Sequence, residues 1–139
     1  EENNKIKITA DNENWHRTGD LGYIDASGRL WLLGRAKAEI SRGSEKIYPF
    51  SIETMLSFEK DIKRTAIISK KGKILLFIEI FYTEDKEKQL QIQDKLEEKI
   101  KELKITVDKV IFADKIPVDK RHNGKIDYGS LERLSEKYI

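Results

Sequence analysis

The 139-residue chain contains no cysteine, only two histidines and only two prolines. The absence of cysteine excludes a disulfide scaffold, a zinc site built from thiolates and a cysteine nucleophile. The two histidines, His16 and His122, are too few for most histidine-based metal sites, so we expect this chain to form no metal centre. Its 27 basic and 25 acidic residues leave a net charge of only +2. We therefore expect no nucleic-acid partner.

Long apolar runs are also missing. The longest one, residues 74–82, is interrupted by Glu79 and is far too short to cross a bilayer. No secretory signal is visible, so we expect a cytoplasmic protein without a membrane span. Hydrophobic residues make up 38% of the chain, which is enough for one modest core. The chain begins with Glu1 rather than Met, and we expect it to be a fragment of a longer protein.

The apolar pattern predicts an α+β fold: a small sheet of about three strands, flanked by two or three helices, with N-terminal β-hairpins. Residues 6–9 are expected to form a short edge strand or a frayed end. Two hairpins are expected, at 21–33 around a turn at 25–28 and at 40–48. The later elements are expected as a helix at 49–60, strands at 65–69 and 73–81, a helix at 84–104, a strand at about 109–113, a loop at 114–127 and a last short helix.

The architecture changes between Gly34 and Lys37. Before this point the chain predicts hairpins only, and after it strands and helices follow one another. We therefore place a domain boundary here, with residues 1–36 in one part and 37–139 in the other.

The first functional motif is the T-G-D triplet at 18–20. A carboxylate that follows a tight turn is held rigidly and points outward, so Asp20 could accept hydrogen bonds from the vicinal hydroxyls of a ribose. By itself, the triplet favours a turn or cap residue that has no ligand.

The second motif starts with Gly34 and Arg35 and continues through Gly43 and Ser44 to P-x-x-I-E at 49–53. An arginine at a strand end can reach a polar ligand, and a Gly-Ser pair lets the backbone approach one closely. A plain hairpin turn with a solvated arginine is the alternative.

The third motif is the basic stretch at 115–125. The stretch has a local charge of +3, because it contains a single acid, Asp119, and four basic residues. The basic residues are Lys115, Lys120, Arg121 and Lys125. A loop with glycine beside lysine suits delivery of one ammonium to a phosphate or a carboxylate. The alternative is an ordinary solvated loop.

In their order and spacing, these motifs resemble the adenylate-forming superfamily, which includes acyl-CoA synthetases, the adenylation domains of peptide synthetases, and luciferases. The resemblance extends from about Trp15 to Leu131. It implies that residues 1–36 are the tail of a large N-terminal domain and that 37–139 are the small C-terminal domain. The implied function is an ATP-dependent, AMP-forming carboxylic acid ligase.

The resemblance also implies a role for individual residues. Asp20 and Arg35 would bind the ribose of the nucleotide, and Lys37 would lie at the hinge between the domains. Lys125 would be the catalytic lysine between the acyl carboxylate and the α-phosphate. The hairpin at Gly43 and Ser44 would face the acceptor.

The partners implied are ATP and a carboxylic acid, with CoA or a carrier-protein thiol as acceptor, and the chain's own N-terminal domain. That domain would hold most of the ATP and Mg²⁺, so the fragment alone should be inactive. Two departures from the family leave alternatives open. The segment from Pro117 to Lys125 is longer than usual, and the hairpin glycine falls at Gly43 rather than at Ser44. These departures favour a β-lactone synthetase-like enzyme that activates a β-hydroxy acid without CoA. A non-catalytic carrier-docking module is a second, separate alternative.

Overall fold

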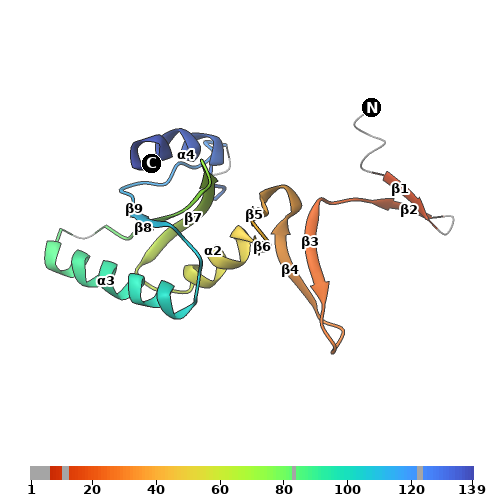
Figure 1. Ribbon diagram of the computed structural model, residues 1–139, viewed down its shortest axis with the longest axis horizontal. Coiled ribbons are helices and arrows are strands. Elements are labelled where there is room, and N and C mark those ends of the chain that lie inside the picture. The colour runs from red at the N-terminus through yellow and green to blue at the C-terminus, as the bar shows by residue number, and fades with distance from the viewer. Residues whose placement is uncertain (1–6, 11–12, 83, 122–123) are drawn as a thin grey trace.

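The computed structural model describes residues 7–10, 13–82, 84–121 and 124–139. In this part of the chain, three antiparallel ribbons precede the main sheet (Figure 1). They are formed by β1 (Lys7–Ala10) with β2 (Glu13–His16), β3 (Asp20–Ile24) with β4 (Leu30–Arg35), and β5 (Ile40–Arg42) with β6 (Glu45–Ile47). A 3₁₀ turn, η1 (Ala36–Ala38), separates the second ribbon from the third.

The main sheet has the strand order β7–β8–β9. The strands β7 (Ile62–Lys70) and β8 (Lys73–Ile80) are antiparallel, and β9 (Lys109–Phe112) runs parallel to β8. A parallel pair needs a crossover connection, which the helix α3 (Lys86–Glu102) supplies.

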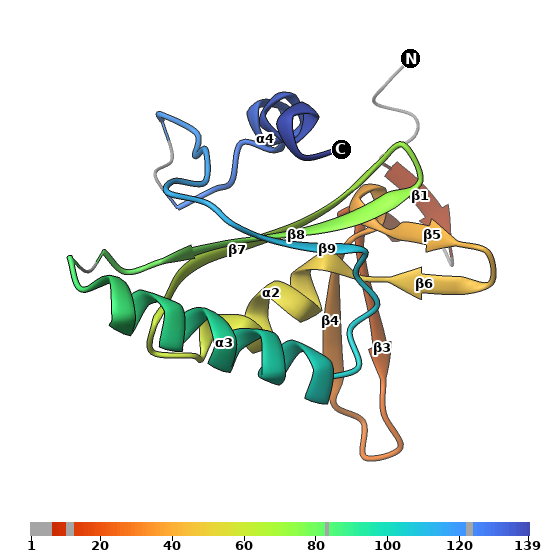
Figure 2. The ribbon, with the colours of Figure 1, turned by 60° about the vertical axis from the view of Figure 1, so that its left-hand side comes forward.

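Helices cover both faces of this sheet. Figure 2 shows α2 (Pro49–Ser57) and α3 on one face and α4 (Tyr128–Ser135) on the other. The side chains of β8 alternate between the two layers: Leu76 and Ile78 pack toward α2 and α3, while Leu75 and Phe77 pack toward α4. Burial on both faces explains why this strand is a continuous apolar run. A 3₁₀ turn, η2 (Glu136–Tyr138), follows α4.

The predicted α+β class, both hairpins and the order of elements from residue 40 onward are confirmed. Some boundaries differ. The strand β7 begins at Ile62 rather than at residue 65, with a register shift between Ile62 and Arg64. At the N-terminus, residues 7–10 pair with a second strand, β2, which the sequence did not indicate. None of the helices in the described ranges combines the length and the apolar character that a membrane span needs.

The β3–β4 hairpin projects from the rest of the molecule beside α2 (Figure 1). Its base lies close to this helix: a Cβ on Gly34, whose φ is +114°, would lie 2.6 Å from the Cβ of Phe50. Only glycine fits such an approach. Further along, the hairpin exposes large apolar side chains, namely Tyr23, Ile24, Leu30, Trp31 and Leu32.

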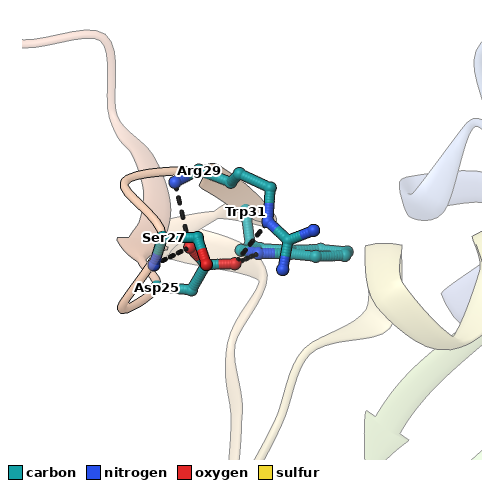
Figure 3. A network of polar contacts seen from close by, with 4 residues as sticks. All are labelled: Asp25, Ser27, Arg29 and Trp31. Atoms are coloured by element: carbon teal, nitrogen blue, oxygen red, sulfur yellow. Dashed lines mark hydrogen bonds and ion pairs between the residues drawn. The ribbon is translucent and has the colours of Figure 1, made fainter.

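The turn of this hairpin is organised by Asp25 (Figure 3). Its carboxylate accepts hydrogen bonds from the amides of Ser27 (2.9 Å) and Arg29 (3.0 Å), from Nε of Arg29 (2.8 Å) and from the indole N–H of Trp31 (2.9 Å). These donors, above all Trp31, lower the pKa of Asp25 to about 2. The turn is therefore rigid, although it is largely surrounded by solvent.

Candidate functional site

Asp20 and Arg35, the two residues predicted to bind a nucleotide, are in contact. They lie opposite each other in the β3–β4 register, with Nε of Arg35 3.2 Å from Oδ1 of Asp20. The Arg35 guanidinium also donates to the carbonyl of Thr18 at 2.8 Å. The amide of Ala36 donates to the carbonyl of Gly19 at 2.9 Å. The T-G-D turn and the Gly-Arg pair thus form one polar corner.

This corner remains open to a ligand. The side chain of Arg35 is 70% exposed and that of Asp20 is 38% exposed. An ion pair this exposed contributes little to stability. The corner offers carboxylate acceptors beside guanidinium donors, which is the chemistry that recognises vicinal hydroxyls.

Lys37 lies in η1, directly after this corner, and is exposed. Together with Arg35 it lines a cavity of about 550 Å³ between the 3₁₀ turn, β5, β7 and α4. The other lining residues include Ser41, Pro49, Ile67, Ser69, Tyr128 and Glu132. The predicted hinge residue therefore lies between the β3–β4 hairpin and β5, and a hinge at Lys37 stays a prediction.

Lys125 belongs to the loop between β9 and α4. This loop lies on the same side of the sheet as α4 (Figure 2). At the base of this loop, the incoming and outgoing strands of chain pair in an antiparallel manner. Val118 forms a bridge with Ile126, and the amide of Asp119 donates to the carbonyl of Lys125 at 2.9 Å. The Lys125 side chain is exposed, and it makes no ion pair with any described residue. His122 and Asn123 lie outside the described residues.

Basic side chains converge around this loop. A cavity of about 960 Å³ is lined by Lys115, Lys120, Arg121 and Lys125, together with the two acids Asp119 and Asp127. Arg121 lies 3.7 Å from the carboxylate of Asp119. A hollow lined by several cations favours an anionic ligand such as a phosphate.

The start of the loop is fixed by a buried carboxylate that we did not single out as functional. Glu79 is 1% exposed and accepts from the amide of Ile116 at 2.8 Å and from the ammonium of Lys63 at 2.7 Å. Burial raises the pKa of Glu79, but these donors and the nearby Arg64 outweigh it, and the pKa lies below its ordinary value. The only trace of this role in the sequence is one acid within an apolar strand.

The end of the loop is fixed by Tyr128. Its hydroxyl donates to the carboxylate of Glu53 in α2, at 2.9 and 3.1 Å from the two oxygens. Glu53 also accepts from the amide of Ile67 at 3.0 Å. Burial raises the pKa of Glu53, despite these two donors, and burial beside Glu53 raises the pKa of Tyr128. The sequence showed Glu53 only as the end of the P-x-x-I-E motif and gave no sign of its partner.

Gly43 and Ser44 form the exposed turn between β5 and β6. Gly43 has a φ of +60°, which favours glycine. The adjacent Arg42 pairs with Asp108, whose carboxylate also accepts from the amide of Ile74 at 2.7 Å. The hairpin is thereby tied to the main sheet, while its proposed contact with an acceptor stays a prediction.

The predicted site residues thus form two groups. Asp20, Arg35 and Lys37 lie together at the base of the β3–β4 hairpin, and Lys125 lies on a separate loop. The cavities of the two groups share one lining residue, Tyr128. Within the described ranges, no group of three His, Cys, Asp or Glu residues is placed to hold a metal ion.

Comparison with known proteins finds relatives among acid–CoA ligases. The 2-succinylbenzoate–CoA ligase of Lactococcus lactis is 34% identical over 109 residues, which are 78% of this chain and 24% of the ligase. The oxalate–CoA ligase of Saccharomyces cerevisiae is 35% identical over 130 residues, covering 82% of this chain and 21% of the ligase. The chain thus spans about a quarter of these relatives or less. No protein-family model matches it.

Solved structures share the fold. A fatty acyl CoA synthetase of Mycobacterium tuberculosis superposes with a TM-score of 0.62 and 26% identity, over 94% of this chain and 26% of that one. ATP-bound MatB of Rhodopseudomonas palustris superposes with a TM-score of 0.65 and 24% identity, over 99% of this chain and 27% of that one. Both superpositions therefore include the hairpins as well as the main sheet.

Proposed function

Because this chain is homologous to acid–CoA ligases and has the fold of a segment of adenylate-forming acyl-CoA synthetases, we propose that it is the C-terminal part of an ATP-dependent, AMP-forming carboxylic acid ligase. The observation that carries this proposal is the pairing of Asp20 with Arg35, together with a Lys125 whose ammonium has no ion-pair partner among the described residues. The T-G-D and G-R motifs thereby provide a polar corner, and the lysine of N-G-K provides a separate ammonium for the same ligand.

In the first half-reaction, a carboxylate oxygen attacks the α-phosphorus of ATP, the bond to the β-phosphate oxygen breaks, and acyl-AMP and pyrophosphate form. Two anions approach each other in this step. The ammonium of Lys125, placed between them, reduces their repulsion and stabilises the charge of the transition state. Lysine suits this task because its ammonium is a compact charge on a flexible stem.

Asp20 and Arg35 would hold the ribose in both half-reactions, because ATP and acyl-AMP share it. They precede the proposed hinge at Lys37, whereas Lys125 follows it. Rotation about the hinge would thus present the Lys125 loop for adenylation and the Gly43–Ser44 turn for acyl transfer. In this assignment residues 1–36 belong to the large N-terminal domain and 37–139 to the small domain.

A large N-terminal domain also suits the β3–β4 hairpin. Several large apolar side chains of this hairpin are about half exposed or more, among them Tyr23, Ile24 and Leu30. An isolated two-stranded ribbon is marginal in water, and a partner surface would bury these side chains. In this assignment Mg²⁺ would bind with ATP, mainly on the N-terminal domain.

CoA is the acceptor that we favour, since the relatives described above are CoA ligases. An acyl-AMP could also be captured by an internal hydroxyl, as in the β-lactone alternative. The two acceptors are separated by their products: a thioester forms only when CoA is added, whereas a β-lactone forms without it.

The test is carboxylic-acid-dependent exchange of labelled pyrophosphate into ATP, measured on the full polypeptide that contains this chain. We expect exchange with at least one acid from a panel that includes 2-succinylbenzoate, oxalate and indoleacetate, the acids named for the relatives. Exchange that does not depend on any acid, or ATP cleavage to ADP, would contradict an AMP-forming ligase.

A further inference from the structure

One side-chain pair connects the two faces of the main sheet around its edge. The strand β7 is an edge strand, and its Ile67 amide donates to Glu53 instead of to a neighbouring strand. Glu53 comes from α2 on one face, and its partner Tyr128 is the first residue of α4 on the other. The contact therefore links α2, β7 and α4 at one point.

Tyr128 follows Lys125 by only three residues. Between them, Asp127 accepts from the amide of Ser130 at 3.0 Å and so caps the start of α4, while its own amide donates to the carbonyl of Pro117 at 3.0 Å. The chain from Lys125 to Tyr128 is thus short and fully hydrogen-bonded at its end. Because only two residues separate them, we expect a displacement of Tyr128 relative to α2 to move the backbone of Lys125.

We propose that Glu53 and Tyr128 are positioning residues, which hold the Lys125 loop at a fixed place relative to α2 and the hinge. The proposal rests on the function assigned to Lys125 above. Catalysis by a single ammonium depends on its position, and a displacement of about 1 Å can slow a reaction by up to about a hundredfold. Among the described residues, Tyr128 is also the one that lines both the Lys125 cavity and the Arg35–Lys37 cavity.

If this pair served only to stabilise the fold, its loss should loosen the packing of α2 and α4. The helix α4 is anchored separately, through the fully buried Leu131, and α2 is anchored through the fully buried Leu56. Loss of the Glu53–Tyr128 hydrogen bond should therefore leave α2 and the Leu131 end of α4 packed, and release only the first turn of α4, where Tyr128 lies. Its effect should be concentrated on the loop that Tyr128 ends.

The first experiment measures amide hydrogen exchange in the full polypeptide. Tyr128→Phe removes only the hydroxyl, whereas Glu53→Ala removes the acceptor of both the Tyr128 hydroxyl and the Ile67 amide. We expect each change to speed exchange in residues 114–127 by about tenfold, with β8 and α3 unchanged. Glu53→Gln, which keeps an acceptor oxygen, should restore the loop. The matched control is Tyr82→Phe, at a tyrosine that is 87% exposed.

The second experiment measures the two half-reactions in the same variants. Tyr128→Phe and Glu53→Ala should each lower kcat of pyrophosphate exchange by about tenfold. The KM for ATP, and thioester formation from supplied acyl-AMP, should remain near wild type. The double variant should be no slower than Glu53→Ala alone, because Glu53→Ala already removes the contact with Tyr128.

The outcomes separate this proposal from the proposed function. Unchanged hydrogen exchange of the loop in both single variants would overturn the positioning role. Faster hydrogen exchange of the loop with unaltered adenylation would also overturn it, because the pair would then be only a structural anchor. Absence of adenylation in the wild-type protein would instead contradict the assigned function, while the exchange measurement would still report on the contact.

Discussion

The carboxylate of Asp20 and the guanidinium of Arg35 face each other across the β3–β4 hairpin, with Oδ1 3.2 Å from Nε. The pairing depends on an irregularity in the hairpin. The register from Ile24–Leu30 to Gly22–Leu32 is regular, but a shift between Leu21 and Gly22 places Arg35, rather than Gly34, opposite Asp20. A bulge that re-aims a side chain in this way is common beside functional sites.

We predict that Asp20→Asn weakens binding of both ATP and acyl-AMP in the full polypeptide. The substitution keeps the size of the side chain but removes the charge that strengthens hydrogen bonds from the ribose hydroxyls. The expected loss is about 1 kcal/mol, or roughly fivefold in Kd. Calorimetric titration with ATP and with a non-hydrolysable acyl-AMP analogue measures it. A loss confined to one of the two ligands would contradict a ribose contact that is kept through both half-reactions.

The isolated 139-residue chain should bind ATP only weakly, with a Kd of about 1 mM or higher. Few exposed polar contacts overcome the entropic cost of association, and in our assignment most of the nucleotide pocket lies on the N-terminal domain. Titration followed by NMR chemical shifts of the chain measures this affinity. Saturable binding in the micromolar range would mean that the nucleotide site lies within the chain itself.

The hinge proposal predicts a local weak point at η1. We expect the amides of Ala36 and Glu39 to exchange with solvent much faster than those of β8, because local opening there leaves the main core intact. The bond from Glu39 to Ala36 is already long, at 3.4 Å. Native-state hydrogen exchange of the chain, followed residue by residue, tests this. One cooperative unit that includes residues 34–39 would remove the basis for a hinge at Lys37.

Asp25 provides a prediction of pH dependence. Its pKa is lowered from 3.8 to about 2, so the stability that it contributes is present above the unfolded value and is lost as the pH falls through about 2. Since the carboxylate accepts from the indole of Trp31, Trp31 fluorescence should report this titration. The variant Trp15→Phe leaves Trp31 as the only tryptophan for the measurement. A Trp31 midpoint near 4, or one that is unchanged by Asp25→Asn, would contradict the network in Figure 3.

Much of the fold could be predicted from the sequence because each element has a strong local pattern. The turn at 25–28 and the spacing of Ile92, Leu96 and Ile100 are examples, and both elements are confirmed. The parallel pairing of β8 with β9 could not be predicted, since it depends on a crossover through α3 and not on any local pattern.

The candidate site was predictable to a lesser degree. Asp20 and Arg35 could be named from their motifs, but their contact depends on the bulge, which leaves no mark in the sequence. The bond between Glu53 and Tyr128 joins residues 75 positions apart. Neither residue type indicates a partner at that distance, so only the packing of α2 and α4 around β7 reveals it.

The central claim is that Lys125 serves adenylation. The most direct measurement compares Lys125→Ala with wild type in the full polypeptide, in pyrophosphate exchange and separately in acyl transfer from supplied acyl-AMP. Loss of a charge contact made in the transition state should cost about 3 kcal/mol, so exchange should slow by over a hundredfold while acyl transfer changes little. Lys120→Ala, on the same loop and lining the same cavity, is the matched control and should retain most of the exchange activity. Equal slowing of both half-reactions by Lys125→Ala, or equal loss in the Lys120 variant, would contradict the account.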